Sequence, residues 1–549
     1  MPSTSVPPPA IDALPRQAAR DPDFWLLAVA VLTLFATGIQ LLIYPFGRSI
    51  AAHALLGRVI LSGGVPVRDA WTAAAPGIGL LHAGIQLVLG RSMMAFRAVE
   101  TIMLVSAVLA VTRITKHWMG LERVGLLGGA LFALTYVQLE IDNTGQPEFF
   151  AGVLLVIAVA LCARETAPRS RWAVAILLGC LLGTLTIFVP SFALVALAFP
   201  RLFTRRIGAA PQSRSRDWLQ IGCMVLGFIV PLAAMTVWLS VVGASTIFAR
   251  DYLGPLVHVW LSSSIVTLVA RIFHLACGAV LNQSAFITAG LLATFTLGTL
   301  HEHERAGRRR LMSLALLVLV ALALQTSDTP GALSAVLPLT TTVAGIGIYK
   351  TWRRIMQLGT AGTVAFWVTA LFLVQMCVPV RYPPGSFFKR SRTRLLYLSG
   401  HAPYRSREML ESELYSSADY NLTSSRRVAA SLRARSLTNR AVWVAGNEPQ
   451  LAWMLEAVPQ YRFLEPVPAS WASATPELAR RASNEANVLQ PEVIVTSSST
   501  AVSDATLRST ARSTEDYDLL EVTDNWRTYQ RVQKRPRAED DTEFCDPNL

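Results

Sequence analysis

The sequence predicts a polytopic α-helical membrane protein with a small α/β domain at its C-terminal end. Of the 549 residues, 52% are hydrophobic and 15% are charged, and the mean hydropathy is +0.42. That composition is too apolar for a soluble chain of this length. Uncharged stretches recur, and each needs only about 20 apolar residues to cross roughly 30 Å of hydrocarbon. After Arg381 the composition becomes that of a soluble protein.

The spacing of the apolar stretches predicts about eleven membrane crossings. Residues 1–380 carry 27 Lys and Arg against 15 Asp and Glu. The basic residues cluster between alternate spans, which marks the cytoplasmic side rather than a nucleic-acid surface. The first apolar run is too long for a cleaved signal sequence, so we expect a retained helix and a cytoplasmic N-terminus. The expected spans lie near residues 24–44, 93–114, 124–140, 147–163, 172–189, 190–200, 218–241, 276–299, 311–326, 330–348 and 357–380.

An odd number of crossings divides the chain into three parts. Residues 1–23 form a cytoplasmic tail, and 24–380 form the transmembrane domain with outer loops at 45–92 and 242–275. Residues 381–549 form an extracytoplasmic α/β domain with a frayed C-terminal tail. We therefore expect a multi-pass protein of the inner (plasma) membrane, whose C-terminal domain is periplasmic or extracellular.

Shorter elements follow from local patterns. In the outer loops, the interrupted apolar stretches His53–Leu61, Pro76–Leu89 and Tyr252–Val269 suit helices that lie in the membrane interface. In the C-terminal domain, strand and helix patterns alternate, which predicts a small sheet with helices. The expected elements there are a strand at 441–446, a helix at 450–457, a strand at 493–496 and a closing strand pair at 517–532.

The most informative motif is Ser62–Trp71, which reads SGGVPVRDAW. It lies in the first outer loop, between the first apolar helix and the second, and it places Asp69 beside Arg68 at a membrane surface. Further along come Pro76 and then Gly-Arg-Ser at 90–92. An aspartate beside an arginine at a membrane surface suits chemistry on an anionic substrate carried by a lipid.

The order of these features resembles a known superfamily. An apolar helix, Gly-Gly-x-Pro-x-Arg-Asp-x-Trp, Pro, an amphipathic stretch, Gly-Arg-Ser, Arg97 and a second apolar helix are similar to the membrane-embedded GT-C glycosyltransferases, of the glycosyltransferase family 39, protein mannosyltransferase and aminoarabinose transferase type. The resemblance covers residues 24–165, extends to 380 by helix layout, and is weak in the tail. It implies a many-helix membrane domain, polyprenyl-phosphate sugar donors, and a catalytic aspartate in the first outer loop.

Such a transfer needs a base for the acceptor proton and cations for the departing phosphate. By the resemblance, Asp69 is the general base. Arginines bind phosphate oxygens through two parallel hydrogen bonds. Positive charge is normally kept in cytoplasmic loops, so an anionic ligand offers a reason for arginines in an outer loop. The alternative is structural: Asp69 caps the loop against Arg68, and the arginines contact ordinary anionic lipids. The expected ligands of the donor phosphate are Arg68, Arg58, Arg91 and Arg97.

The short second outer loop is dense in carboxylates. Asp142 and Glu148 are expected to bind the acceptor or to assist a metal, and the alternative is that they cap helices. No cofactor is required by the pattern, although a divalent cation could assist. Glu100 follows Arg97 on one helical face, which favours a structural ion pair. The six cysteines are scattered without metal-ligand spacing, so they predict neither a zinc site nor a disulfide framework.

Two lysines of the resembled families are missing. Three alanines, at 73–75, precede Pro76 where many relatives carry a lysine, and the segment 186–191 (TIFVPS) stands where many carry another after the fifth span. Either arginines replace them, or the chain is a catalytically inactive GT-C-like scaffold or subunit of a membrane complex. A transporter is less expected, because the two halves show no matching pair of helices broken by glycine or proline and there is little intramembrane charge for ion coupling. The expected partners are a polyprenyl-phosphate sugar, membrane lipids and an unidentified acceptor, without nucleic acid.

The predicted orientation can be checked with reporter fusions. Because basic loops alternate, position 305 should be cytoplasmic and position 430 extracytoplasmic. Fusions of a reporter that is active only outside the cytoplasm should therefore give a signal at 430 and none at 305. Matching signals at the two positions would contradict the layout.

Overall fold

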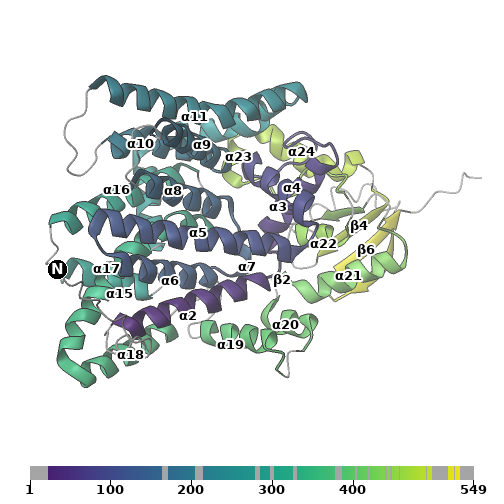
Figure 1. The fold of residues 1–549 in the computed structure, drawn as a ribbon. Coiled ribbons are helices and arrows are strands. Elements are labelled where there is room, and N and C mark those ends of the chain that lie inside the picture. Colours follow the sequence, from purple (N-terminus) through teal and green to yellow (C-terminus); the bar gives the residue numbers. More distant parts are fainter. Residues whose placement is uncertain are drawn as a thin grey trace, which may run out of the picture.

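The computed structural model describes the chain from Asp23 to Arg531 with gaps. The described residues are 23–163, 171–204, 214–278, 285–296, 302–325, 330–376, 386–401, 405–417, 420–438, 442–445, 448–456, 458–489, 491–497, 517–524 and 526–531. The expected cytoplasmic tail lies outside them except for Asp23. Long apolar helices lie side by side, and a small sheet lies beyond one end of them (Figure 1).

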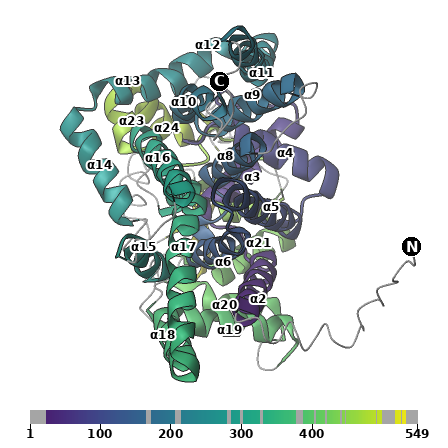
Figure 2. The ribbon, with the colours of Figure 1, turned by 60° about the vertical axis from the view of Figure 1, so that its left-hand side comes forward.

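A helix is found at each expected span. The helices of this part are α2 (Asp23–Leu42), α5 (Met93–Met119), α6 (Glu122–Gln138), α8 (Pro147–Ala163), α9 (Arg171–Phe188), α10 (Ala193–Thr204), α11 (Arg214–Val241), α15 (Ala285–Thr296), α16 (Glu302–Gln325), α17 (Leu337–Ile355) and α18 (Gly359–Gln375). Along the bundle, α6 and α8 lie inside, whereas α14 (Ile265–Cys277) and α18 lie at the edge (Figure 2).

Among the described residues, five helices are long and apolar enough to cross a membrane, or six if one bent pair counts as a span. The bent pair joins 245–262 to α14 at an angle of 101°, within the segment expected to lie in the interface. The number of eleven crossings therefore stays a prediction. The five qualifying helices are Asp23–Leu42, Met93–Met119, Arg171–Phe188, Trp218–Val241 and Leu337–Leu373.

Short helices connect the long ones at the end near the sheet. Residues that favour helix ends mark their boundaries. Pro76 is the first residue of helix Pro76–Leu89, and Gly90 follows its last residue at φ +83°, a backbone conformation that favours glycine. Ser92 caps the next by accepting a hydrogen bond from the Met94 amide at 3.1 Å. These connecting elements are α3 (Arg48–Leu61), α4 (Pro76–Leu89), α7 (Glu140–Asn143), η2 (Pro190–Phe192), α12 (Ser245–Phe248), η3 (Ala249–Leu253), α13 (Gly254–Ser262), η5 (Pro330–Ala335) and η6 (Met356–Leu358).

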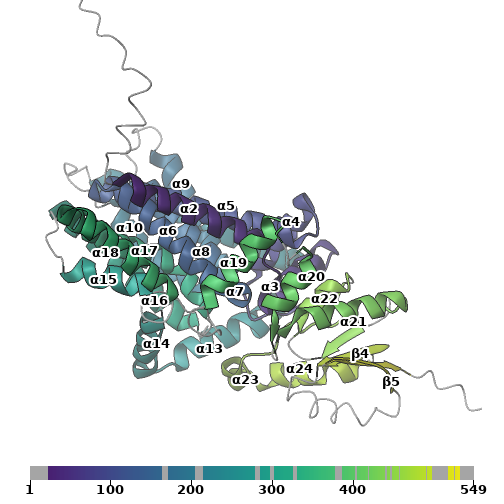
Figure 3. The same cartoon turned by 90° about the horizontal axis from the view of Figure 1, so that it is seen from below.

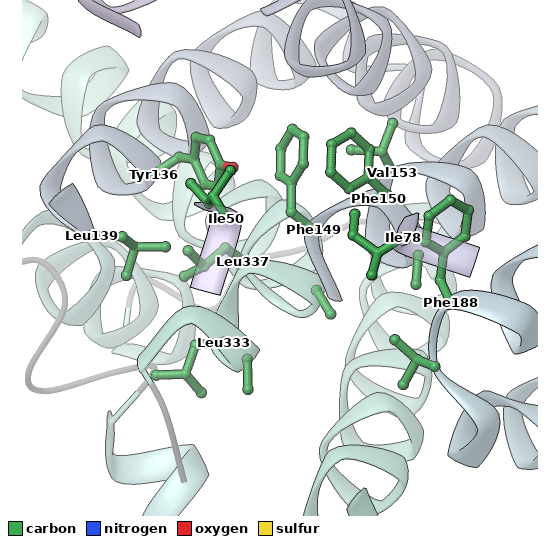
Figure 4. Close-up of a cluster of buried hydrophobic side chains, with 14 of the residues drawn as sticks. Ile50, Ile78, Tyr136, Leu139, Phe149, Phe150, Val153, Phe188, Leu333 and Leu337 are labelled. Atoms are coloured by element: carbon green, nitrogen blue, oxygen red, sulfur yellow. The ribbon is translucent and has the colours of Figure 1, made fainter. Parts of the chain in front are cut away.

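The core lies where the long and the connecting helices meet. Aromatic and branched side chains from α3, α4, α6, α8 and α17 converge there (Figure 4). Tyr136 and Phe149 stack with their ring centroids 4.3 Å apart. Close helix packing depends on glycine, because a Cβ on Gly128 would lie 2.8 Å from the Thr342 Cα. The same cluster of buried side chains continues into the C-terminal part, where Trp453 packs against Phe46.

The C-terminal part contains a four-stranded mixed sheet in the order β3-β4-β6-β5. β3 (Val442–Ala445) and β4 (Val493–Ser497) are parallel, as expected of a strand-helix-strand unit, and β5 (Tyr517–Thr523) and β6 (Trp526–Arg531) form the predicted closing pair. The sheet lies at the end opposite α15 and α18 (Figure 3). The remaining elements are α19 (Ser386–Leu398), α20 (Arg407–Leu414), β1 (Ser416–Ser417), β2 (Tyr420–Asn421), α21 (Leu422–Ala434), α22 (Pro449–Met454), α23 (Ala469–Ala474) and α24 (Pro476–Leu489).

A buried carboxylate joins the two parts. Glu140, in α7, accepts hydrogen bonds from the Arg390 Nε at 2.9 Å and Nη2 at 3.1 Å, and from Arg394 of the same helix, α19. The Arg394 guanidinium also lies over the Tyr44 ring at 4.5 Å and donates to the Tyr415 hydroxyl. Since these groups are excluded from water, each depends on the others for compensation of its charge.

Removal of that carboxylate should destabilise the protein. Glu140→Gln takes away the negative charge that two buried guanidinium groups share, and breaking a buried pair in this way costs about 3–5 kcal/mol. We expect a clear drop in the Tm of the purified protein in detergent. Glu122→Gln is the matched control, because its partner Lys116 and Glu122 itself are both more than half exposed, at 55% and 57%. Equal Tm values for the two variants would contradict a structural role for Glu140.

Candidate functional site

The segment 45–92, expected from the sequence to be the first outer loop, folds around the Arg68–Asp69 pair. Asp69 accepts hydrogen bonds from the Arg68 Nε at 2.9 Å, from the Arg68 Nη2 at 2.8 Å, and from the Val65 amide at 2.8 Å. The remaining Nη1 of Arg68 donates to the Val242 carbonyl at 3.0 Å. Both side chains are more than a third exposed. The loop thus ties itself together and to the end of α11.

Hydrogen bonds from Arg68 lower the pKa of the Asp69 carboxyl below its usual value, despite partial burial. Asp69 is therefore a carboxylate at neutral pH, as a general base must be. These three hydrogen bonds use both acceptor positions of Oδ2 and one of the two on Oδ1, so one acceptor position of the partly exposed carboxylate remains. The expected base and the expected phosphate ligand satisfy each other in this conformation.

The same loop pairs with the C-terminal part. The Trp71 amide donates to the Arg462 carbonyl at 2.6 Å, and the Leu464 amide donates to the Trp71 carbonyl at 3.1 Å. Arg462 returns to the loop through its Nε, which donates to the Val67 carbonyl at 2.7 Å. The buried Trp71 ring packs against Phe463 and Trp471. This strand-like pairing brings the segment after Phe463 next to residues 71–74 of the loop.

A cavity of about 260 Å³ lies beneath this junction. Two carboxyl groups, of Glu148 and Glu465, lie on its wall, with the aromatic rings of Tyr252 and Trp471 and the amides of Gln146 and Gln325. Glu148 stands in the first turn of α8, directly after Pro147. The full lining is Ser49, His53, Ala73, Ala74, Gln146, Pro147, Glu148, Tyr252, Leu256, Gln325, Glu465, Pro468 and Trp471.

Burial perturbs the ionisable groups of this cavity. It raises the pKa of Glu465 to about 7, although hydrogen bonds from the Ala73 amide and the Ser49 hydroxyl act in the opposite direction. It lowers the pKa of His53 to about 3, so that ring is neutral at pH 7. A carboxyl group that titrates near neutral pH can give or take a proton under working conditions.

Two predicted arginines, Arg58 and Arg91, line a different pocket of about 560 Å³. Arg58 follows Ser49 by nine residues, which is about two and a half turns of helix α3. Arg58 therefore projects from the face of α3 opposite to Ser49, and the pocket and the carboxylate cavity lie on opposite sides of this helix. The structure brings Arg58 together with Arg91, and neither with Asp69.

The other predicted residues are placed as follows. Arg97 is fully buried and donates to Glu100 at 2.6 Å, to Thr144 at 3.1 Å, and to the carbonyls of residues 44 and 45. The expected structural pair with Glu100 is present, and Arg97 would have to leave it to bind a phosphate. Asp142 is partly buried, and its Oδ1 accepts from the Arg48 amide at 3.3 Å at the start of α3.

Several residues were not foreseen from the sequence. Glu465, Tyr252 and Trp471 reach the cavity from segments expected to be a small α/β domain and an interfacial loop. Local patterns carry no signal for this, because the pairing of Trp71 with residues 462–464 is long-range. Among the described residues, no group of three or more His, Cys, Asp or Glu side chains could hold a metal ion.

Comparisons with solved structures identify the fold. ArnT from Cupriavidus metallidurans with bound undecaprenyl phosphate has a TM-score of 0.55 at 13% identity, covering 93% of this chain and 99% of that one. Its apo structure also has a TM-score of 0.55, at 14% identity, over 92% and 98% of the two chains. No protein-family model and no curated protein matches the sequence. The chain has the fold of the GT-C glycosyltransferases, which confirms the fold class expected from the sequence.

Glu465 should make stability depend on pH. The pKa of its carboxyl is raised by folding, so its stabilising contribution is complete below the unfolded value of about 4 and is lost as the pH rises through about 7. Glu465→Gln cannot ionise, so its Tm should fall less than that of the wild type between about pH 5 and about pH 9. Glu477→Gln, on the exposed side of α24, should follow the wild type. Equal losses in Glu465→Gln and the wild type would contradict the raised pKa.

Proposed function

We propose that the chain is a glycosyltransferase that moves a sugar from a polyprenyl-phosphate donor to an acceptor at the outer face of the membrane. The cavity under the first outer loop carries the proposal. It encloses two carboxyl groups beside aromatic rings and side-chain amides, the combination that binds sugar hydroxyls and transfers their protons. The GT-C fold supports the same class of reaction.

Two residues compete for the role of general base. The sequence predicts Asp69, which in this conformation is bonded to Arg68 and does not line the cavity. Glu148 does line it, is 4% exposed, and follows Pro147 in a position predicted to bind the acceptor. If Asp69 is the base, the loop must open when substrate binds. If Glu148 is the base, the Arg68–Asp69 pair holds the loop that closes the cavity.

The arrangement of charges favours a second candidate, a catalytically inactive scaffold that binds a lipid carrier. Of the described residues that line the cavity, none is an arginine or lysine. Two of the four arginines expected to hold the donor phosphate, Arg58 and Arg91, line the pocket on the other side of α3. A donor has its sugar bonded directly to phosphate, whereas a helix is about 10–12 Å across. One bound donor therefore cannot use both sites.

An assay of transfer distinguishes these alternatives. The full chain in proteoliposomes would be supplied with radiolabelled polyprenyl-phosphate sugars and a membrane extract as the source of acceptor, and release of label from the donor would be measured. Loss of a general base costs about 10²- to 10⁴-fold in rate. Asp69→Asn and Glu148→Gln are the test variants, and Glu477→Gln, with its side chain 70% exposed, is the control.

Three outcomes decide between the alternatives, provided that every variant keeps its wild-type Tm. A loss confined to Asp69→Asn makes Asp69 the base and requires an open state of the loop. A loss confined to Glu148→Gln makes Glu148 the base. No turnover by the wild-type protein with any donor of the panel contradicts the transferase and leaves the scaffold.

A further inference from the structure

We propose that the pocket beyond α3 binds the phosphate-bearing head group of a membrane lipid, at a site separate from the carboxylate cavity. The pocket is formed between the two parts of the chain. Arg58 and Arg91 come from the first outer loop, and Arg407, Arg426 and Arg433 come from helices α20 and α21. The two groups are more than 300 residues apart in the sequence, so only the folded junction assembles them.

Arginines outnumber carboxylates among the described residues that line this pocket. Glu411 accepts from Arg407 at 2.9 Å and from Arg426 at 2.7 Å, and Glu456 accepts from Arg433 at 3.0 Å. Among the described residues, the lining of this pocket of about 560 Å³ contains five arginines and one carboxylate, that of Glu456. Guanidinium groups that converge on a shared space form the arrangement that binds phosphate oxygens.

Arg58 is the innermost of these cations. It is 1% exposed, and its guanidinium lies over the Trp453 ring at 4.3 Å. Burial and the neighbouring Arg91 lower the pKa of Arg58 to about 10, although the Glu456 carboxylate acts in the opposite direction. The fold therefore holds the exposed Arg91 close to the buried Arg58. An anion bound between the two guanidinium groups would relieve their repulsion.

The rim of the pocket points to a lipid as the source of the anion. Met93 and Met94 line the pocket at the start of α5, a helix long enough to cross the membrane. The last turn of α4, just before Arg91, exposes Leu87, Val88 and Leu89, with Val88 78% exposed. An apolar surface beside a pocket lined by arginines matches an amphiphile, whose acyl chains lie along the rim while its phosphate enters the pocket.

This site is independent of sugar transfer. It lies on the face of α3 opposite to the side that carries Ser49 and His53, and both of these line the carboxylate cavity. A lipid held there contacts both the membrane part and helices α20 and α21. It would therefore stabilise the docking of the C-terminal part whether or not the chain transfers a sugar.

Native mass spectrometry of the full chain in detergent tests the site. The probes are phosphatidic acid, which exposes a phosphate monoester, and phosphatidylcholine, whose phosphate is covered by choline. We expect selective adducts with phosphatidic acid and about tenfold weaker binding by Arg91→Gln, since Arg91 is exposed and its loss leaves the fold intact. Arg392→Gln is the control, because Arg392 is an exposed arginine of α19 that does not line the pocket.

A second variant and a competitor complete the test. Arg433→Gln removes a pocket charge that comes from the other part of the chain and should weaken the adducts as Arg91→Gln does, with a wild-type Tm as the check on folding. Equal binding by Arg91→Gln and Arg392→Gln would overturn the site. Complete displacement of the lipid by millimolar inorganic pyrophosphate would overturn the lipid source and leave a site for free phosphate anions. A loss of adducts together with normal transfer activity would separate this site from the proposed function.

Discussion

The architecture depends on one buried interaction, the carboxylate of Glu140 shared by Arg390 and Arg394. Glu140 adopts φ +59°, an uncommon conformation for a residue other than glycine, at the point where α6 gives way to α7. A fold retains such a conformation only when its surroundings determine it. Here the surroundings are two arginines of α19, which position the whole C-terminal part on the helical bundle.

That positioning creates the cavity. Once α19 is docked, the segment after Tyr461 can pair with Trp71, and Glu465 then closes a space whose other carboxyl group, Glu148, belongs to the bundle. Asp251 adds a second connection, since its carboxylate accepts from Arg462 at 2.6 Å and from Arg481 at 3.3 Å. The motif Ser62–Trp71 therefore serves as a docking surface for the C-terminal part, and Trp71 makes the contacts through its backbone and its ring.

Local patterns predict much of this fold, and the reasons for the exceptions are physical. Apolar runs fix the helices of the bundle, because their length and hydropathy are properties of single segments. The strands of the C-terminal sheet are predicted in the same way, because strand and helix patterns alternate along this part of the sequence. The cavity cannot be predicted from local patterns, because Glu465 and Trp471 reach it through the pairing of Trp71 with a segment almost 400 residues away. Asp69 is conspicuous in the sequence for its neighbour Arg68, and that neighbour binds it in the folded protein.

Helix α3 separates the cavity lined by carboxyl groups from the pocket lined by arginines, whereas a single transfer site would need both kinds of group together. One face carries Ser49 and His53 toward the carboxyl groups, and the other carries Arg58 toward four more arginines. Carboxyl groups and guanidinium groups kept on two sides of one helix cannot pair with each other at contact distance. An acidic cavity suits hydroxyl-bearing ligands, and a basic pocket suits phosphate. Both are walled by the same short helix and by the docked C-terminal part, so a ligand that moves α3 or weakens that docking would act on both sites together.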